Sequence, residues 1–185
     1  APLTLATDAI GVFFHDGTKV VCLDRSTGQQ KWASQPIAQA SDMRSWFAPT
    51  LVVKDGVVVF AGGENIVRHR GGIDTMTALS AETGAVLWTA EHPPSGYDSP
   101  EDVLIVDGLV WTAPITNRRD TGFYTGRDLQ TGEVKRSFPA DDGDHMPHHR
   151  CHRAKATERF ILASRTGIEY VDLQAEHWNR NDWVR

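Results

Sequence analysis

The residues with the most chemical potential form a histidine-rich segment in the last quarter of the chain. Four histidines and a cysteine lie close together: His145, His148, His149, Cys151 and His152. Zinc and copper sites need three or four such ligands converging on one point. Neighbouring residues of a strand point to opposite faces, so His149 and Cys151 are expected to share one side, whereas His148 and His152 are expected to face away from them. The spacing matches no standard metal site. We predict no metal centre, with His149 and Cys151 as weak candidates; substrate-contacting and structural roles stay open.

Arginine is concentrated in two other polar segments, 63–72 and 115–122. Arginine offers permanently charged, bidentate donors that suit carboxylate, sulfate and phosphate groups. We therefore expect an anion-binding surface made by Arg68, His69, Arg70, Arg118, Arg119, His145, His148 and His149. The alternative is that these arginines pair only with neighbouring carboxylates such as Glu64, Asp120 and Asp141.

Composition limits the classes of function. The chain has 185 residues, of which 40% are hydrophobic and 23% charged, enough for one globular domain with a sizeable core. Nineteen Lys and Arg against 24 Asp and Glu give a net charge of −5, which disfavours nucleic-acid binding. No uncharged apolar stretch approaches the length of a membrane helix, and the given residues do not begin with a basic-then-apolar leader. We expect no membrane span and no signal peptide within these residues.

A repeated segment predicts the fold that positions the candidate residues. Residues 22–32 and 78–88 are similar, 126–136 form a weaker copy, and 167–173 retain only an echo. Aligned on Asp24, Ser80, Asp128 and Asp172, the copies are 56, 48 and 44 residues apart. These steps bracket the roughly 40–50 residues of a four-stranded propeller blade.

Each repeat contains the signals of two hairpins. A Thr-Gly turn lies inside each of the first three copies, and Asp-Gly turns at 55–56 and 107–108 join apolar runs. We therefore predict an all-β chain: one β-propeller domain, 1–185, of four-stranded antiparallel blades. The four blades are expected at about 1–36, 48–92, 100–139 and 148–185. We expect them to be part of a larger propeller, although closed four-bladed rings exist.

The predicted blades separate the loops by face. The Asp-Gly and Thr-Gly turns belong to one face of a propeller. The long segments 63–72, 115–122 and 141–150 belong to the other face, together with their arginines and histidines. Long polar loops on a rigid scaffold are where binding residues concentrate.

The repeat also resembles a known family. Its pattern, A-x-D-x-x-T-G-x-x-x-W, is similar to the tryptophan-docking motif of the pyrroloquinoline-quinone (PQQ)-type propellers. Residues 22–32 depart from it only at Cys22, and residues 78–88 only at Ser80, whereas 126–136 have lost both the Ala and the Trp. The resemblance implies that Trp32 and Trp88 pack between adjacent blades. Structural roles are expected for these tryptophans and for the turn glycines Gly28, Gly84 and Gly132.

The members of this family have several different functions. It includes quinoprotein alcohol dehydrogenases and non-catalytic outer-membrane-assembly lipoproteins, so the resemblance implies a bacterial, periplasmic or otherwise extracytoplasmic protein. PQQ and calcium are cofactors by resemblance only. The adjacent Cys-Cys pair of many such dehydrogenases is absent, and the family's calcium ligands have no assigned positions here. We favour a binding or scaffold module whose Arg- and His-rich face binds a protein partner, an anionic small molecule or a glycan. A PQQ-dependent oxidoreductase and an enzyme acting on acidic polysaccharide remain alternatives, with no catalytic residue assigned.

Overall fold

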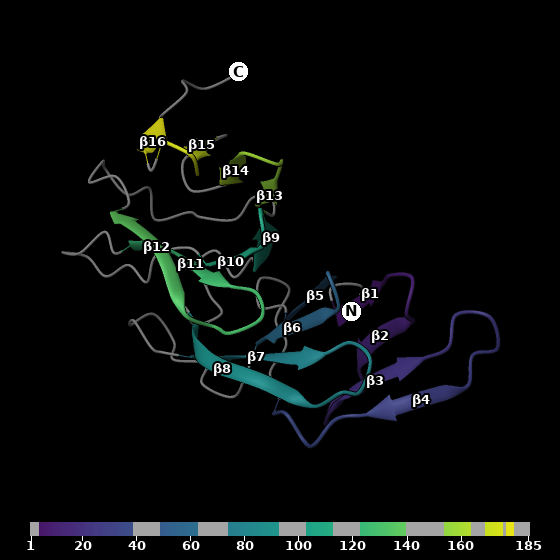
Figure 1. The fold of residues 1–185 in the computed structure, drawn as a ribbon. Helices are drawn as coiled ribbons and strands as arrows, with labels where there is room; N and C mark the ends of the chain where they lie inside the picture. The colour runs from purple at the N-terminus through teal and green to yellow at the C-terminus, as the bar shows by residue number, and fades with distance from the viewer. Residues whose placement is uncertain are drawn as a thin grey trace.

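The computed structural model describes residues 4–38, 49–62, 74–92, 103–112, 123–139, 154–163, 169–175 and 177–179. These residues form four antiparallel sheets of four strands each, and every sheet is a meander in which sequence neighbours pair (Figure 1). No helix long and apolar enough to cross a membrane occurs in the described ranges. The prediction of an all-β chain of four-stranded antiparallel blades is confirmed.

The strand bounds follow the repeats. The first blade contains β1 (Leu5–Thr7), β2 (Val12–His15), β3 (Val20–Leu23) and β4 (Gln30–Ala33). The second contains β5 (Thr50–Lys54), β6 (Val57–Ala61), β7 (Asp74–Ser80) and β8 (Val86–His92). The third contains β9 (Leu104–Val106), β10 (Leu109–Thr112), β11 (Phe123–Asp128) and β12 (Val134–Pro139). The fourth contains β13 (Lys155–Ala156), β14 (Phe160–Ala163), β15 (Glu169–Asp172) and β16 (His177–Asn179).

The first strand of each blade lies on the inside of the arrangement. Strand β1 contacts β5, β5 contacts β9, and β9 contacts β13, so the four sheets fan out from a shared inner line (Figure 1). The last strand of each sheet is therefore at its outer edge. This is the architecture of a β-propeller, in which each blade packs face to face on the next.

The hydrophobic core is divided among the three junctions between consecutive blades. Strand β6 shows why, because all five of its residues are buried and its successive side chains face opposite neighbours. Val58 and Phe60 pack toward the first blade, whereas Val57 and Val59 pack toward the third. A continuous apolar run is thus expected for a strand that is covered on both faces.

The Thr-Gly turns share one hydrogen-bonded geometry. In the first blade the Gly28 amide donates to the Asp24 carbonyl at 2.9 Å, and the Asp24 amide donates to the Gln29 carbonyl at 2.8 Å. The same pair of bonds recurs at Ser80 and Asp128. Gly84 and Gly132 both have φ +74 and Gly28 has φ +70, a left-handed conformation that glycine adopts without steric cost. The turn chemistry is therefore the reason that the repeat retains its glycine.

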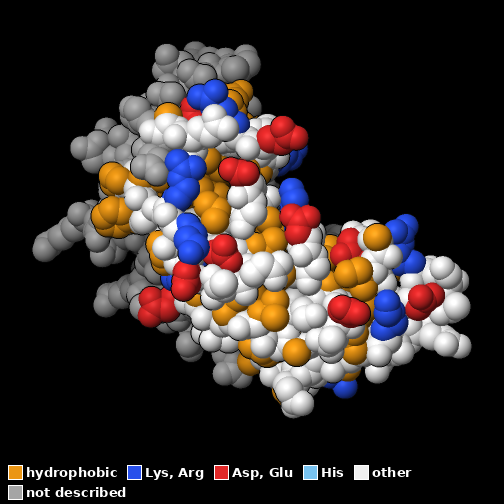
Figure 2. Space-filling view, in the orientation of Figure 1, with side chains coloured by type: hydrophobic (Ala, Val, Ile, Leu, Met, Phe, Trp, Pro, Cys, Tyr) orange, Lys and Arg blue, Asp and Glu red, His pale blue; other side chains and the backbone are white. Residues whose placement is uncertain are grey.

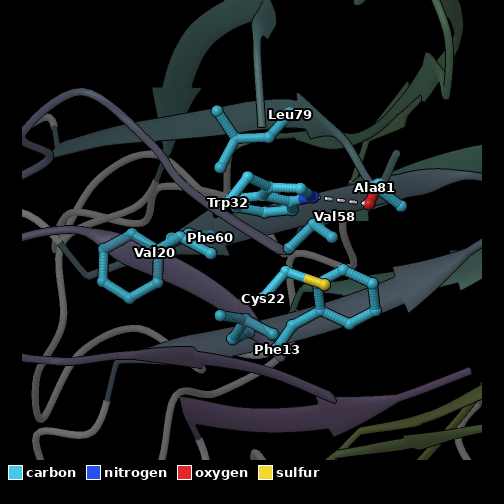
Figure 3. Close-up of a cluster of buried hydrophobic side chains, with 9 residues drawn as sticks. Phe13, Val20, Cys22, Trp32, Val58, Phe60, Leu79 and Ala81 are labelled. Carbon is cyan, nitrogen blue, oxygen red and sulfur yellow. Dashed lines mark hydrogen bonds between the residues drawn. The ribbon is translucent and has the colours of Figure 1, made fainter. Parts of the chain in front are cut away.

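Trp32 and Trp88, the junction tryptophans, connect each of the first two blades to the next. The Trp32 indole Nε1 donates to the Ala81 carbonyl at 2.9 Å, and a Cβ on Gly84 would lie 2.5 Å from its Cε3 (Figure 3). Trp88 Nε1 likewise donates to the Leu129 carbonyl at 3.0 Å, and a Cβ on Gly132 would lie 2.7 Å from its ring. Each indole thus lies directly over the turn glycine of the following blade.

The third junction is built differently. Arg136 occupies the tryptophan position of the repeat, and its Nη2 donates to the Gln174 carbonyl at 3.4 Å. The apolar volume comes from Trp111, which is 1% exposed and packs against Phe138 at a ring separation of 5.9 Å. A Cβ on Gly126 would lie 2.8 Å from Trp111, so the smallest residue faces the largest one across the two strands.

The fourth blade lacks the Thr-Gly turn and has an ion pair in its place. Asp172 Oδ1 accepts hydrogen bonds from the amides of Gln174 and Ala175, at 3.0 and 3.2 Å. Arg159 Nε donates to both carboxylate oxygens of Asp172, each at 3.1 Å. These hydrogen bonds, that of Arg159 foremost, lower the pKa of Asp172 to about 2.

We expect Trp88→Ala to destabilise the protein strongly. Trp88 is 8% exposed, and truncating a buried Trp costs about 3–5 kcal/mol in the free energy of unfolding. The matched control is Leu87→Ala on the same strand, because Leu87 is 41% exposed and surface substitutions usually change stability by about 0.5 kcal/mol or less. Chemical denaturation measures both. Equal midpoints for the two variants would show that the indole does not hold this junction.

We expect Asp172→Asn to make the free energy of unfolding less dependent on pH in the acidic range. The folded pKa of Asp172 lies below its unfolded value of 3.8, so the stability it contributes is present above about pH 4 and is lost as the pH falls toward 2. Asparagine keeps the acceptor oxygen but not the charge. The free energy of unfolding, measured from pH 5 down to pH 2.5, should therefore fall less steeply in the variant than in wild type. The exposed Asp107→Asn serves as control, and parallel curves for wild type and Asp172→Asn would contradict the assignment.

Candidate functional site

The predicted anion-binding residues lie outside the described ranges. This applies to all eight of them, namely Arg68, His69, Arg70, Arg118, Arg119, His145, His148 and His149, and to the weak metal candidate Cys151. Their grouping therefore stays a prediction. The structure describes the strands on either side of these segments. Those strands form the framework to which the segments are attached.

The flanking strand ends belong to one end of the sheets, which we call the long-loop end. Strand β6 finishes at Ala61 and β7 begins at Asp74; β10 finishes at Thr112 and β11 begins at Phe123. Because neighbouring strands are antiparallel, these termini are opposite the Asp-Gly and Thr-Gly turns. The end that carries those turns is the short-turn end. The connections at the short-turn end are short turns. Those at the long-loop end include the longer segments that contain the predicted arginines and histidines.

Carboxylates recur in the turns of the short-turn end. Each turn between the first and second strands of a blade contains one carboxylate, and further acids lie in the turns between the third and fourth strands. They are Asp8, Asp55, Asp107 and Glu158 in the first set, and Asp24, Glu82, Asp128, Glu133 and Asp172 in the second. Arg25 and Arg159 lie in the same turns, and Lys54 ends the strand before Asp55. Basic side chains from the adjoining strands also donate to these turns: Lys31, Arg127, Lys135 and Arg136. Acidic and basic side chains are both spread over the visible face in Figure 2.

Several of these carboxylates cap their own turns. Asp24 Oδ1 accepts from the amides of Ser26 and Thr27 at 3.0 and 2.9 Å, and from the Thr27 hydroxyl at 2.9 Å. Asp128 Oδ1 accepts from the amides of Gln130 and Thr131 at 3.0 and 2.8 Å. Hydrogen bonding to the charged form, led by the amides of Thr27 and Thr131, lowers the pKa of Asp24 and Asp128. Asp24 and Asp128 therefore stay ionised at neutral pH, where they stabilise their own turns.

The long-loop end contains a buried histidine that sequence reasoning missed. His15 is 7% exposed and stacks on Phe60 of the second blade, with ring centroids 4.4 Å apart and planes 14° from parallel. Its Nδ1 accepts from the Gly17 amide at 3.1 Å, which leaves Nε2 to donate to the Ile37 carbonyl at 2.8 Å. Both nitrogens are thus used to hold the chain around β2. Its position in an aromatic strand suggested only packing, and Phe60 approaches it only in the tertiary fold.

The described residues provide no cluster of side chains suited to hold a metal ion. No cluster of three His, Cys, Asp or Glu side chains with metal-ligand geometry occurs among them. Cys22 is buried in the first junction, and burial raises the pKa of its thiol. Reactive thiols are instead lowered in pKa and partly exposed. No catalytic role is assigned to these described residues.

Comparison with solved structures supports the architecture. BamB from Moraxella catarrhalis aligns with 94% of this chain at a TM-score of 0.61 and 14% identity, and the chain spans 47% of that protein. Quinohemoprotein alcohol dehydrogenase ADHIIG from Pseudomonas putida HK5 aligns with 97% at 0.58 and 15% identity, over 34% of its length. The corresponding enzyme from Comamonas testosteroni aligns with 91% at 0.56 and 16% identity, over 33% of its length. At these identities the likeness concerns the fold.

Comparison of sequences identifies the family. No curated protein matches the chain. The family model described as outer membrane protein assembly factor BamB matches residues 4–145, which is most of the chain and includes the first three described blades. The repeats, the four-stranded blades and this match agree, and the chain belongs to the BamB family of PQQ-like repeat β-propellers.

Proposed function

We propose that this chain is a scaffold propeller that binds a protein partner through its long-loop end, by means of an acidic surface on that partner. The observation that carries the proposal is the clustering of arginines and histidines in particular connecting segments. At the described short-turn end, by contrast, nine carboxylates alternate with seven basic side chains, namely Arg25, Lys31, Lys54, Arg127, Lys135, Arg136 and Arg159. The clustered arginines and histidines occur instead in the segments that connect strands at the other end.

Physical chemistry favours the long-loop end as the binding surface. The short turns are compact, and the carboxylates of Asp24 and Asp128 already accept hydrogen bonds from backbone amides of their own turns. Long connections on a rigid sheet can adapt to a partner without disturbing the core. Arginine adds bidentate recognition of carboxylates, and complementary charge accelerates association.

The family description supports a protein partner and an extracytoplasmic location. BamB is described as an outer membrane protein assembly factor. We infer that this chain is a binding module of such an assembly and that it works in the periplasm. Because the chain spans less than half of the BamB structure, this role is proposed for the whole protein of which these blades form the matched part.

Charge reversal in the arginine segments should weaken binding of an acidic probe. We expect Arg68→Glu and Arg118→Glu each to reduce the affinity for poly-glutamate about tenfold, because each removes a charge-assisted hydrogen bond of about 1.5–3 kcal/mol. Lys54→Glu is the matched control, since this exposed lysine precedes the Asp55-Gly56 turn at the short-turn end. Calorimetric titration at low and physiological salt measures the affinities.

The same titration gives a pH test. An unperturbed histidine gains charge as the pH falls through about 6.5, so binding should strengthen from pH 8 to pH 6 and weaken with salt. Equal losses in Lys54→Glu and Arg68→Glu would show that only net charge matters. Preference for a sulfated glycan over poly-glutamate would replace the protein partner with a polysaccharide. Dye-linked alcohol oxidation after addition of PQQ and calcium would favour the oxidoreductase instead.

A further inference from the structure

The third blade exposes an apolar pair at the long-loop end. Phe123 begins β11, Pro139 ends β12, and the two residues are paired across the antiparallel strands (Figure 1). Phe123 is 56% exposed, and Pro139 is exposed as well. A single exposed apolar side chain is ordinary on a protein surface. This pair differs from such a residue in its position in the repeat, its support and the segments joined to it.

The same position is polar in the first two blades. The residue equivalent to Phe123 is Lys19 in the first blade and Thr75 in the second. Thr75 pairs with Glu91 in the same register in which Phe123 pairs with Pro139. A solvent-facing position at the end of a strand is normally polar, and these two blades follow that rule. The third blade thus has an aromatic ring where the repeat does not require one.

Buried aromatic neighbours hold the pair in place. Tyr124 follows Phe123 in the chain, and Phe138 precedes Pro139. The rings of Tyr124 and Phe138 are 1% and 3% exposed, and they stack with centroids 5.4 Å apart in the third junction core. Because successive residues of a strand face opposite sides, the burial of these rings turns Phe123 and Pro139 to the other face of the sheet. A side chain on a fixed backbone loses little conformational freedom when a partner covers it.

Both residues are joined to segments rich in basic side chains. The segment 115–122, which contains Arg118 and Arg119, ends at the residue before Phe123. The segment 141–150, which contains His145, begins two residues after Pro139. Four residues of chain span at most about 15 Å, so a ligand that covers Phe123 is within reach of Arg119. A ligand at this pair is therefore offered an apolar surface and cationic groups together.

We propose that Phe123 and Pro139 form the apolar anchor of the partner-binding surface, and that the partner segment presents an aromatic side chain beside its carboxylates. This inference rests on the function proposed for the long-loop end and adds an aromatic requirement to it. Paired aromatic rings contribute more than the area that they bury, and aromatic residues are enriched among those that dominate binding energy. Charge recognises any acidic segment, whereas the exposed ring distinguishes one acidic segment from another.

The test compares two acidic polymers that differ in aromatic content. Poly-glutamate supplies carboxylates alone, and a glutamate–tyrosine copolymer of matched length supplies rings beside them. In calorimetric titration we expect wild type to bind the copolymer about tenfold more tightly than poly-glutamate. Phe123→Ser should remove this preference and leave the affinity for poly-glutamate unchanged. Val134→Ser is the matched control and should keep the preference, because Val134 is 50% exposed on β12 but lies near the short-turn end.

The outcomes separate the anchor from the charge-based function. Both serine variants should melt like wild type, because both side chains are exposed. Equal affinities of wild type for the two polymers, or a preference that survives Phe123→Ser, would overturn the anchor even where Arg118→Glu still weakens binding. Copolymer binding that needs Phe123 but is unaffected by Arg118→Glu would support the anchor and contradict acidic recognition. Binding of neither polymer would overturn both proposals.

Discussion

The structure depends on one contact, the indole of each junction tryptophan lying over a glycine of the next blade. Trp32 and Trp88 each combine a buried aromatic surface with one directed N–H bond to a backbone carbonyl. The aromatic surface supplies affinity, and the hydrogen bond sets the position of the ring. Any side chain on Gly84 or Gly132 would collide with the ring, so the turn glycine serves the junction as well as the turn. Two sheets are thereby joined at one defined position.

This contact belongs to a core that is divided among the blade junctions. Three apolar clusters between consecutive blades hold the described strands together. At the short-turn end, Asp24, Asp128 and Asp172 accept the amides of their own turns. Carboxylates therefore accumulate there for structural reasons. The opposite end has long polar connections, and the proposed function uses the arginines and histidines that these contain.

The third and fourth blades show how the repeat can vary without losing the fold. Arg136 replaces an indole, and Trp111 fills the volume from a different strand because Gly126 leaves room for it. In the fourth blade the Thr-Gly turn is missing, and the ion pair of Arg159 with Asp172 spans the two hairpin turns instead. From the first blades to the fourth, the stabilising contact thus changes from a buried indole to an ion pair. The two hairpin turns of the fourth blade therefore depend on an ion pair that acid weakens.

The blades could be predicted from the amino-acid sequence, because turn chemistry and strand alternation are local. Thr-Gly and Asp-Gly turns require left-handed residues, and their spacing of 56, 48 and 44 residues specified four-stranded repeats before any contact was known. The contacts of Arg136, Trp111 and His15 were not predictable in this way. Each meets residues of another blade or of a distant segment: Gln174, the third junction core, and Phe60 with Ile37. These partners emerge only when the blades pack together, because local periodicity states which face a side chain occupies and not what the neighbouring blade places against it.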